Sequence, residues 1–367
     1  MEEHENKNPL NGKKIVLFVV YGLIAVFLMI TVLSLNDLPS IFEQLKTVDF
    51  SYILLAALMI ILYLAVYPIS LNILTKAKKT NVSSGITYVI GMTEHFFNGI
   101  TPWATGGQPF QAYSFSKARV KLSESTGLLL ANLVIYLISA NTISIMALFF
   151  FSTIASSIDS WWLPVIFTGY ALNFTVLTVM VLLGTSKTLR GWLVRMIRSF
   201  CKFKSFNKFS GKADNVEKYF VQMQEAFRYL THKKWHFALA VITKIISLIF
   251  LDSSTYFMLL SLNIPVQPSH IILIIAGTSF AATAVGFVPT PGAAGGIEGS
   301  TGQVFKSLII YILSGTSVTT VVACANGVVL IWRLLSYYLV MLISLLFYLG
   351  LELYFRRKKN KQTEKIQ

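Results

Sequence analysis

Long apolar stretches constrain this chain more than any other feature of its sequence. A helix needs about 20 residues to cross about 30 Å of hydrocarbon. Six stretches meet this requirement: Ile15–Leu35, Tyr52–Leu74, Leu122–Phe151, Trp161–Leu183, His236–Leu260 and Ser317–Gly350. Only 13% of the residues are charged, whereas soluble domains average about a quarter. The sequence therefore predicts an all-α polytopic membrane protein with about six full spans.

The basic residues are distributed unevenly between the segments that join these stretches. When the amino terminus is placed inside and each stretch crosses once, nearly all of the 31 Lys and Arg residues fall in inside segments. Cytoplasmic loops of membrane proteins carry such an excess of positive charge. We therefore expect both termini to be cytoplasmic. The same sorting accounts for the net charge of +15, so we expect no nucleic-acid partner.

The domain organisation follows from the two polar segments. Residues 1–350 are expected to form one membrane domain, which contains a polar insert at 184–235. Apolar and basic residues recur at helical spacing in this insert, which predicts cytosolic amphipathic helices. These helices either pack on the membrane domain as a hairpin or lie on an anionic leaflet, and the pattern leaves both alternatives open. Residues 351–367 are mostly charged and are expected to form a cytosolic tail.

Two further apolar regions, 84–115 and 270–314, are interrupted by glycine and proline. Both contain the pattern Thr-Pro-x-x-x-Gly-Gly, which we interpret as an internal repeat. The first copy is Thr101, Pro102, Gly106 and Gly107, and the second is Thr290, Pro291, Gly295 and Gly296. The alternative is that these glycines only allow close helix packing.

The interrupted regions predict re-entrant helical hairpins. Irregular backbone cannot face lipid, because its unpaired amides would each cost several kcal/mol, but it is tolerated when it lines a cavity. Basic clusters flank region 84–115 on both sides, so it is expected to enter and leave on the cytosolic side. Region 270–314 is expected to enter and leave on the outer side. Two broken hairpins that enter from opposite faces are typical of inverted-repeat transporters.

Ionisable residues within the apolar segments are few, and a charge buried in a membrane is costly unless it has a function or a partner. Glu94 and Glu298 rank highest, because each lies within eight residues of a repeated Thr-Pro. Lys244 and Arg333 could bind a lipid phosphate, for which arginine is the better bidentate ligand. Four alternatives stay open: Lys244 reaches the cytosolic interface, Asp252 pairs with a basic residue, His95 is an interior hydrogen-bonded histidine, and Lys306 lies near the outer surface.

These arguments define a predicted substrate-binding or translocation set. It comprises Glu94, His95, Asn98, Thr101, Pro102, Gly106, Gly107, Gln108, Lys244, Asp252, Thr290, Pro291, Gly292, Gly295, Gly296, Glu298 and Arg333. The sequence has no His-Glu-x-x-His, Gly-x-Ser-x-Gly, Walker or Cys-x-x-Cys motif. We therefore expect no catalytic residue, no metal site and no cofactor.

The segments Ile100–Tyr113 and Phe287–Gly299 resemble the two signature stretches of the lysylphosphatidylglycerol synthase transmembrane family. This family is the flippase-like membrane half of the bacterial multiple peptide resistance factor, and the resemblance covers nearly the whole chain. It implies a bacterial inner-membrane protein that moves a lipid, in the best-known members aminoacylated phosphatidylglycerol, to the outer leaflet. There the lipid lowers the negative surface charge that attracts cationic antimicrobial peptides.

The full-length factor has a soluble aminoacyl-transferase domain after its last span, and from the 17 residues that follow Gly350 we expect no such domain in this chain. The family label also implies a lysyltransferase activity, which is an alternative to lipid movement, but we see no catalytic domain for it in this sequence. A non-transporting membrane partner of a lipid-modifying enzyme is a second alternative. The partners implied are membrane phospholipids, anionic or aminoacylated, and the resemblance leaves a separate lipid-modifying enzyme and a homo-oligomer open.

Overall fold

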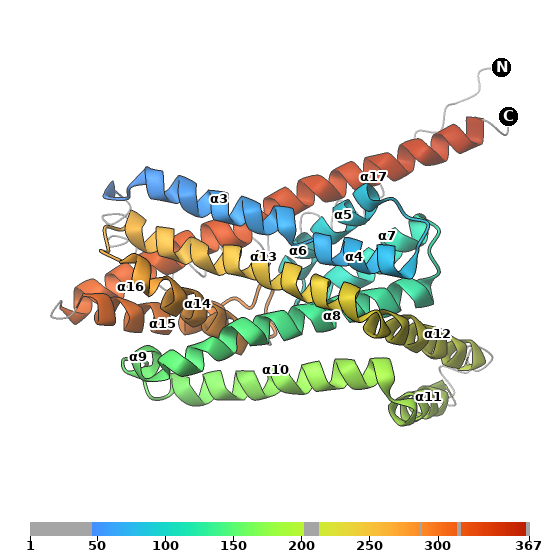
Figure 1. Cartoon of the computed structure of the whole chain (residues 1–367), viewed down its shortest axis with the longest axis horizontal. Coiled ribbons are helices and arrows are strands. Elements are labelled where there is room, and N and C mark those ends of the chain that lie inside the picture. Colours follow the sequence, from blue (N-terminus) through green and yellow to red (C-terminus); the bar gives the residue numbers. More distant parts are fainter. Residues whose placement is uncertain (1–45, 202–212, 287, 314–316, 365–367) are drawn as a thin grey trace, which may run out of the picture.

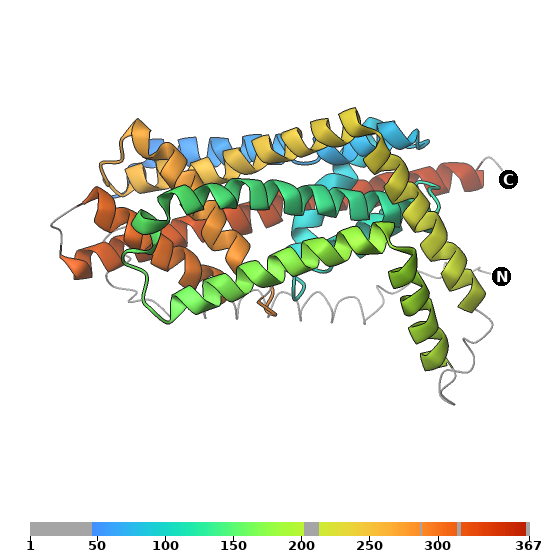
Figure 2. The same ribbon diagram turned by 60° about the horizontal axis from the view of Figure 1, so that its bottom comes forward.

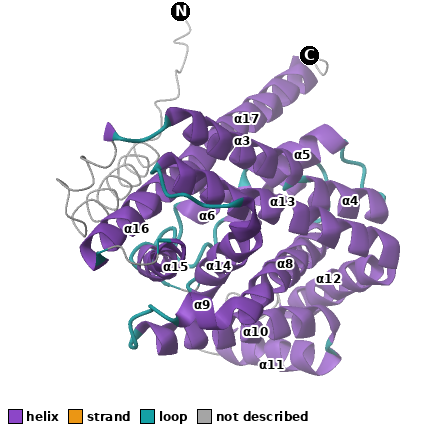
Figure 3. Ribbon diagram, turned by 60° about the vertical axis from the view of Figure 1, so that its left-hand side comes forward, coloured by secondary structure: helices purple, strands orange, loops and turns teal. Residues whose placement is uncertain are grey.

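The computed structural model describes residues 46–201, 213–286, 288–313 and 317–364. The predicted first span, Ile15–Leu35, lies outside the described residues. Every regular element in the described part is a helix (Figure 3). Five helical stretches are long and apolar enough to cross a membrane: Phe50–Lys78, Leu122–Ala155, Trp162–Thr185, Lys234–Ser261 and Val318–Lys358. The prediction of an all-α polytopic membrane protein is confirmed.

Three of the five stretches contain a break. Pro68 separates α3 (Phe50–Val66) from α4 (Ile69–Lys78), because proline has no backbone N–H to donate. A 3₁₀ turn, η1 (Met146–Phe150), joins α8 (Leu122–Ile145) to α9 (Phe151–Ala155). A π-helical segment, η4 (Leu334–Leu339), joins α16 (Val318–Arg333) to α17 (Val340–Glu364). The expected boundary at Gly350 therefore falls inside α17.

The polar insert forms two helices beside the bundle. These are α11 (Lys187–Cys201) and α12 (Ala213–His232), which follow α10 (Trp162–Thr185) and precede α13 (Lys234–Ser261). Both project away from the bundle axis at one end of the molecule (Figure 2). Phe227 and Leu230 of α12 are buried in an apolar cluster with α4 and α8. In α11, by contrast, Trp192 is 51% exposed. The insert was expected either to pack on the membrane domain or to lie on an anionic leaflet, and α12 packs on the membrane domain.

The two interrupted regions form two short helical hairpins. The first contains α5 (Ser84–Met92), α6 (Glu94–Gly99) and α7 (Gly107–Lys117). The second contains η3 (Pro268–His270), α14 (Ile271–Ala284) and α15 (Gly296–Ile312). The hairpins begin and end at opposite ends of the bundle, and both loops lie near its centre (Figure 1). This arrangement agrees with the predicted pair of re-entrant hairpins, because α14 and α15, with 14 and 17 residues, are each too short to cross about 30 Å.

The apolar interior is divided into two clusters along the bundle axis. One is built mainly from α3, α14, α15 and α16, and the other from α4, α5, α7 and α12. The long helices α8, α13 and α17 contribute to both clusters. In α8 and α13 the buried polar residues Ser139 and Lys244 lie at the change from one cluster to the other, and in α17 the buried Ser344 lies between Val340 of the first cluster and Leu351 of the second. A polar layer therefore crosses the middle of the bundle, where the hairpin loops also lie.

The helices α4, α7 and α10 finish at the same end of the bundle (Figure 1), and the segments at this end are rich in basic residues. They include Lys76, Lys78 and Lys79 after α4, Lys117, Arg119 and Lys121 between α7 and α8, and the basic residues of α11 and α12. At the opposite end, among the described residues, the Lys and Arg side chains are Lys46 and Lys306. The structure thus has the one-sided charge distribution that the sequence predicted.

Candidate functional site

The two hairpin loops meet. Pro102 of the first hairpin and Pro291 of the second form an isolated antiparallel bridge, and both loops emerge on one side of the bundle (Figure 2). Pro102, Trp103 and Thr105 are exposed, while Pro291 is half-buried. The repeated Thr-Pro elements, 189 positions apart in the chain, are thus brought together on one side of the bundle, about midway along its length.

The repeated elements also share one backbone conformation. In each loop the two residues after the proline have positive φ: Trp103 and Ala104 in the first loop (54° and 51°), and Gly292 and Ala293 in the second (61° and 52°). Each threonine carbonyl accepts a hydrogen bond from the backbone amide three residues later, at 3.2 Å in the first loop and 3.0 Å in the second. Each proline carbonyl likewise accepts a hydrogen bond from the amide three residues after it, at 3.3 Å in both loops. The predicted sequence repeat is therefore also a repeat of backbone structure.

The glycines that follow allow the first hairpin to close tightly. The Gly106 amide donates to Thr101 Oγ1 at 2.8 Å, and the Gly107 amide donates to Asn98 Oδ1 at 2.8 Å. A Cβ at Gly107 would lie 2.5 Å from Asn98 Oδ1 and 2.9 Å from Glu94 Cγ. The loop thus needs glycine here for a close approach. Gln108 lies half-buried in the first turn of α7.

An ion pair holds the second hairpin to the last residue of α16. Arg333 Nε donates to Glu298 Oε1 at 2.6 Å, and the two side chains are only 4% and 10% exposed. Arg333 Nη2 donates to the Gly292 carbonyl at 3.0 Å, and the Gly295 amide donates to Glu298 Oε2 at 2.7 Å. The pair therefore ties the loop, α15 and α16 together. Arg333, which the sequence analysis proposed as a ligand for a lipid phosphate, is thus already paired with a carboxylate in this structure.

Tyr337 joins the two hairpins and was missed by the sequence analysis. Its hydroxyl donates to the Gly99 carbonyl of the first hairpin at 2.8 Å, and the Arg333 guanidinium lies 4.8 Å from its ring centroid. A Cβ at Gly292 would lie 2.5 Å from the same ring. Tyr337 is in the π-helical segment, a feature that often occurs at functional sites. The available signal was a tyrosine within an apolar span, whose buried hydroxyl needs a partner.

Ser344, one of the residues of the polar layer, was also missed. Its hydroxyl donates to the Met92 carbonyl at 2.6 Å and accepts from the Phe96 amide at 2.9 Å. These two bonds satisfy backbone groups at the break between α5 and α6. A small hydroxyl residue inside an apolar helix is common, so no sequence signal distinguished this one.

Glu94 lies inside the first hairpin and is only 5% exposed. Gln111 Nε2 donates to Glu94 Oε2 at 3.4 Å and to the Ile90 carbonyl at 3.2 Å. The side chains of Tyr67 and Asn98 also lie beside the carboxylate. Glu94 is thus held by neutral groups, whereas Glu298 is held by a cation.

Lys244 is completely buried. Its Nζ donates to the Tyr67 carbonyl at 3.0 Å and lies 3.2 Å from the centroid of the Tyr67 ring. The alternative in which Lys244 reaches the cytosolic interface is therefore wrong. The side chain instead turns inward, because the carbonyl and the ring face together provide the electron density that an ammonium group needs.

The remaining predicted residues have different surroundings. His95 Nδ1 lies 3.5 Å from the Tyr63 hydroxyl, which fits an interior hydrogen-bonded histidine. Asp252 is buried beside Ser279, and within the described residues no Lys or Arg forms an ion pair with it. Lys306 forms an ion pair with Asp159 at 2.8 Å at the end of the bundle, as the surface alternative proposed. Hydrogen bonds from Lys306 and Gln303 lower the pKa of Asp159.

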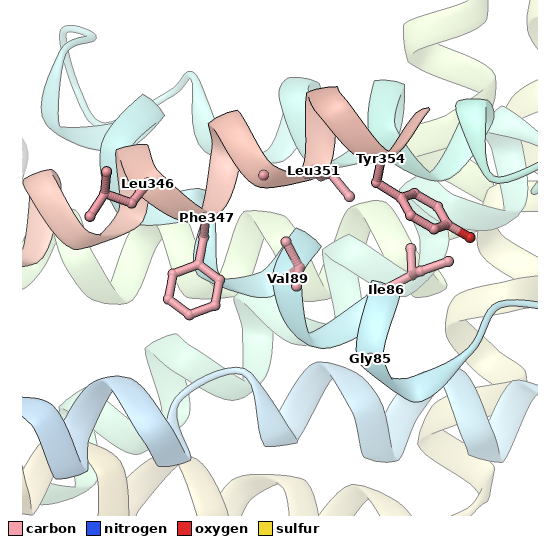
Figure 4. A pocket seen from close by; sticks show the side chains of 8 residues that line it. Gly85, Ile86, Val89, Leu346, Phe347, Leu351 and Tyr354 are labelled. Carbon is pink, nitrogen blue, oxygen red and sulfur yellow. The ribbon is translucent and has the colours of Figure 1, made fainter. Parts of the chain in front are cut away.

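An apolar groove lies between the first hairpin and the last helix (Figure 4). Its volume is ≈ 370 Å³. It is lined by Gly85, Ile86 and Val89 of α5 and by Leu346, Phe347, Gly350, Leu351 and Tyr354 of α17. Ser344 precedes this groove on α17 and donates to the carbonyl of Met92, the last residue of α5. The groove therefore lies next to the break in the first hairpin.

Comparison with known proteins identifies the family. The family model described as the lysylphosphatidylglycerol synthase TM region matches residues 15–344. Because this match spans most of the chain, the protein belongs to that family, and the resemblance inferred from the two Thr-Pro segments is confirmed. A search of curated proteins found no match. The chain is thus a multi-pass membrane protein of a family involved in lysylphosphatidylglycerol metabolism or transport.

Proposed function

Because the chain belongs to this family, we propose that it moves a phospholipid, in particular an aminoacylated phosphatidylglycerol, to the outer leaflet of a bacterial inner membrane. The observation that carries this proposal is the meeting of the two hairpin loops at Pro102 and Pro291. Irregular loops from opposite ends of a bundle, joined at its centre, are the arrangement used by transporters with a fixed central site. The moved lipid would lower the negative charge of the outer surface and so the attraction of cationic peptides.

The proposed headgroup site is the Arg333–Glu298 ion pair together with the two loops. A charge that crosses the bilayer core alone costs at least a few kcal/mol, so it needs partners along its path. The phosphate would displace Glu298 from Arg333, whose planar guanidinium suits phosphate oxygens. The released Glu298 would then bind an ammonium group of the aminoacyl headgroup. Plain phosphatidylglycerol offers no such cation, so this exchange favours the aminoacylated lipid.

The acyl chains need a separate, apolar path. The groove between α5 and α17 offers apolar surface beside the first hairpin. The acyl chains of a lipid could lie along this groove in the hydrocarbon while its polar headgroup reaches the hairpin loops, so that each part of the lipid meets a surface of matching polarity. The groove therefore supports a lipid rather than a soluble substrate.

Vesicles that contain the purified protein test this proposal. Each preparation carries a trace of lysylphosphatidylglycerol or of phosphatidylglycerol, labelled on one acyl chain with a fluorophore that external dithionite bleaches. We expect the protein to accelerate loss of the inner-leaflet fluorescence over protein-free vesicles, and to do so more for the lysyl lipid. Equal rates with and without protein for both lipids would reject the proposal. Synthesis of lysyl lipid from phosphatidylglycerol and lysyl-tRNA would favour the transferase alternative instead.

We further propose that the basic end of the bundle is cytoplasmic, since positive charge is retained there. Single cysteines test this in a background where Cys201 and Cys324 are replaced by serine. Cysteine at Ser269, exposed before α14, is expected to react with an impermeant maleimide on intact cells. Cysteine at Asn81, exposed between α4 and α5, is expected to react only after permeabilisation. The opposite labelling pattern would invert the orientation.

A further inference from the structure

The carboxylates of the two hairpins are held in ways that differ chemically. Glu298 is bonded to a guanidinium at 2.6 Å, and arginine keeps its proton under all ordinary conditions. Glu94 has no Lys or Arg nitrogen within the 4.0 Å limit of an ion pair in the described chain. The cation that acts on it electrostatically is Lys244. Lysine, unlike arginine, can lose its proton when it is buried.

Tyr67 lies between Glu94 and Lys244. Its carbonyl and its ring contact Lys244 Nζ, and its side chain lies beside the Glu94 carboxylate. Neither ionisable group reaches solvent, since Lys244 is 0% and Glu94 is 5% exposed. An apolar environment favours the neutral form of both an acid and an amine. Burial therefore brings the proton affinities of the two groups closer together than they are in water.

Other titratable groups face this pair from the neighbouring helices. His95 of α6 lies with its ring 4.5 Å from that of Tyr67, and its Nε2 is buried without a partner in the described chain. Tyr63 of α3 bonds His95 Nδ1. Tyr136 of α8 and Asp252 of α13 lie near Tyr63. A group of buried titratable side chains thus extends from the first hairpin towards Asp252, which Ser279 of the second hairpin contacts.

We propose that Glu94 and Lys244 form a proton-exchange site, and that the proton gradient drives lipid movement through it. In the resting state the pair holds one exchangeable proton: either Glu94 is a carboxylate and Lys244 an ammonium, or Glu94 is a carboxylic acid and Lys244 an amine. Uptake of one proton from one side of the membrane forms an O–H or N–H bond and gives carboxylic acid with ammonium. Loss of that proton to the other side restores the resting pair. The coupling rests on the proposed function, whereas the proton exchange does not.

The hairpin geometry connects this site to the loops. Glu94 Cγ lies 2.9 Å from the position that a Cβ at Gly107 would take, and Asn98, one turn further along α6, accepts from the Gly107 amide. A change of charge at Glu94 therefore acts directly on the start of α7 and on the loop that meets Pro291. Proton uptake would loosen or tighten the first hairpin against the second.

The exchange itself can be tested without any lipid substrate. Infrared difference spectra of the purified full chain are recorded while the pH is changed. We expect a pH-dependent band of a protonated carboxylic acid that is lost in Glu94→Gln, shifted in Lys244→Met and retained in the matched variant Glu298→Gln. Monodisperse elution of each variant serves as the folding control. A spectrum without such a band, or a band unchanged in folded Glu94→Gln, would overturn the proton-exchange site.

The coupling is tested in the vesicle assay under an imposed pH gradient, with labelled lysylphosphatidylglycerol as the probe. We expect a gradient of one polarity to accelerate lipid movement by the wild type. Lys244→Arg keeps the charge but holds its proton, and Glu94→Gln cannot take one up, so the gradient should accelerate lipid movement less in Lys244→Arg and not at all in Glu94→Gln. A full response in both Lys244→Arg and Glu94→Gln would overturn the coupling. No lipid movement by the wild type, with the infrared band present, would overturn the proposed function and the coupling but not the exchange site.

Discussion

Arg333→Met is expected to abolish lipid movement and to lower the yield of folded protein strongly. The substitution leaves the Glu298 carboxylate, 10% exposed, without its cation, and it also removes the donor to the Gly292 carbonyl. Removal of one partner of a buried ion pair costs about 3–5 kcal/mol, because the remaining charge stays buried and unpaired. Size-exclusion yield and thermal unfolding measure the loss of folded protein, and the vesicle assay measures the loss of lipid movement.

The double variant Arg333→Met with Glu298→Gln separates folding from transport. It leaves no unpaired charge, so we expect the folded yield to recover much of the loss. Lipid movement should stay absent, because neither a phosphate ligand nor a carboxylate for an ammonium group remains. A double variant that folds and moves lipid like the wild type would show that the pair is structural only.

The Lys306–Asp159 pair is the matched control. It has a comparable distance, 2.8 Å, but it lies at the end of the bundle, with the Asp159 side chain 48% exposed. Exposed pairs contribute only about 0–1 kcal/mol. Lys306→Met is therefore expected to change neither the folded yield nor lipid movement measurably. A loss as large as that of Arg333→Met would mean that charge removal from any helix is harmful in this protein.

The spans and the hairpins could be predicted because their signals are local. An apolar run of sufficient length predicts a crossing, and the Gly and Pro positions in regions 84–115 and 270–314 predict where helices stop. The Thr-Pro repeat was informative for the same reason, since its residues determine the backbone of one short loop. Thr101 and Thr290 accordingly begin turns with the same hydrogen bonds.

The partners of the buried charges could not be predicted because they are distant in sequence. Arg333 reaches Glu298 over 35 positions, Lys244 reaches Tyr67 over 177, and Tyr337 reaches Gly99 over 238. Hydropathy shows that such residues are unusual but not what they contact. The repeat was also a poor guide to side chains, because Glu94 precedes its loop whereas Glu298 follows its own.

A disulfide between the two loops is expected to stop lipid movement completely and reversibly. Residues paired across an antiparallel bridge have Cα atoms about 4.5–5.5 Å apart, which lies within the range of about 4.4–6.8 Å that a disulfide spans. Cysteines in place of Pro102 and Pro291 should therefore form a bond on mild oxidation. Cys201 and Cys324 are first replaced by serine, so that the new pair is the only one.

The cross-linked protein tests whether the loops must separate. If the headgroup passes between them, the disulfide prevents its passage, and reduction restores it. The single variants Pro102→Cys and Pro291→Cys, treated with the same oxidant, show whether loss of either proline already impairs movement. Cross-linking is measured by mass spectrometry of the joined peptides, and lipid movement by the dithionite assay before and after reduction. Undiminished movement by fully cross-linked protein would contradict a path between the loops and would direct attention to the groove between α5 and α17.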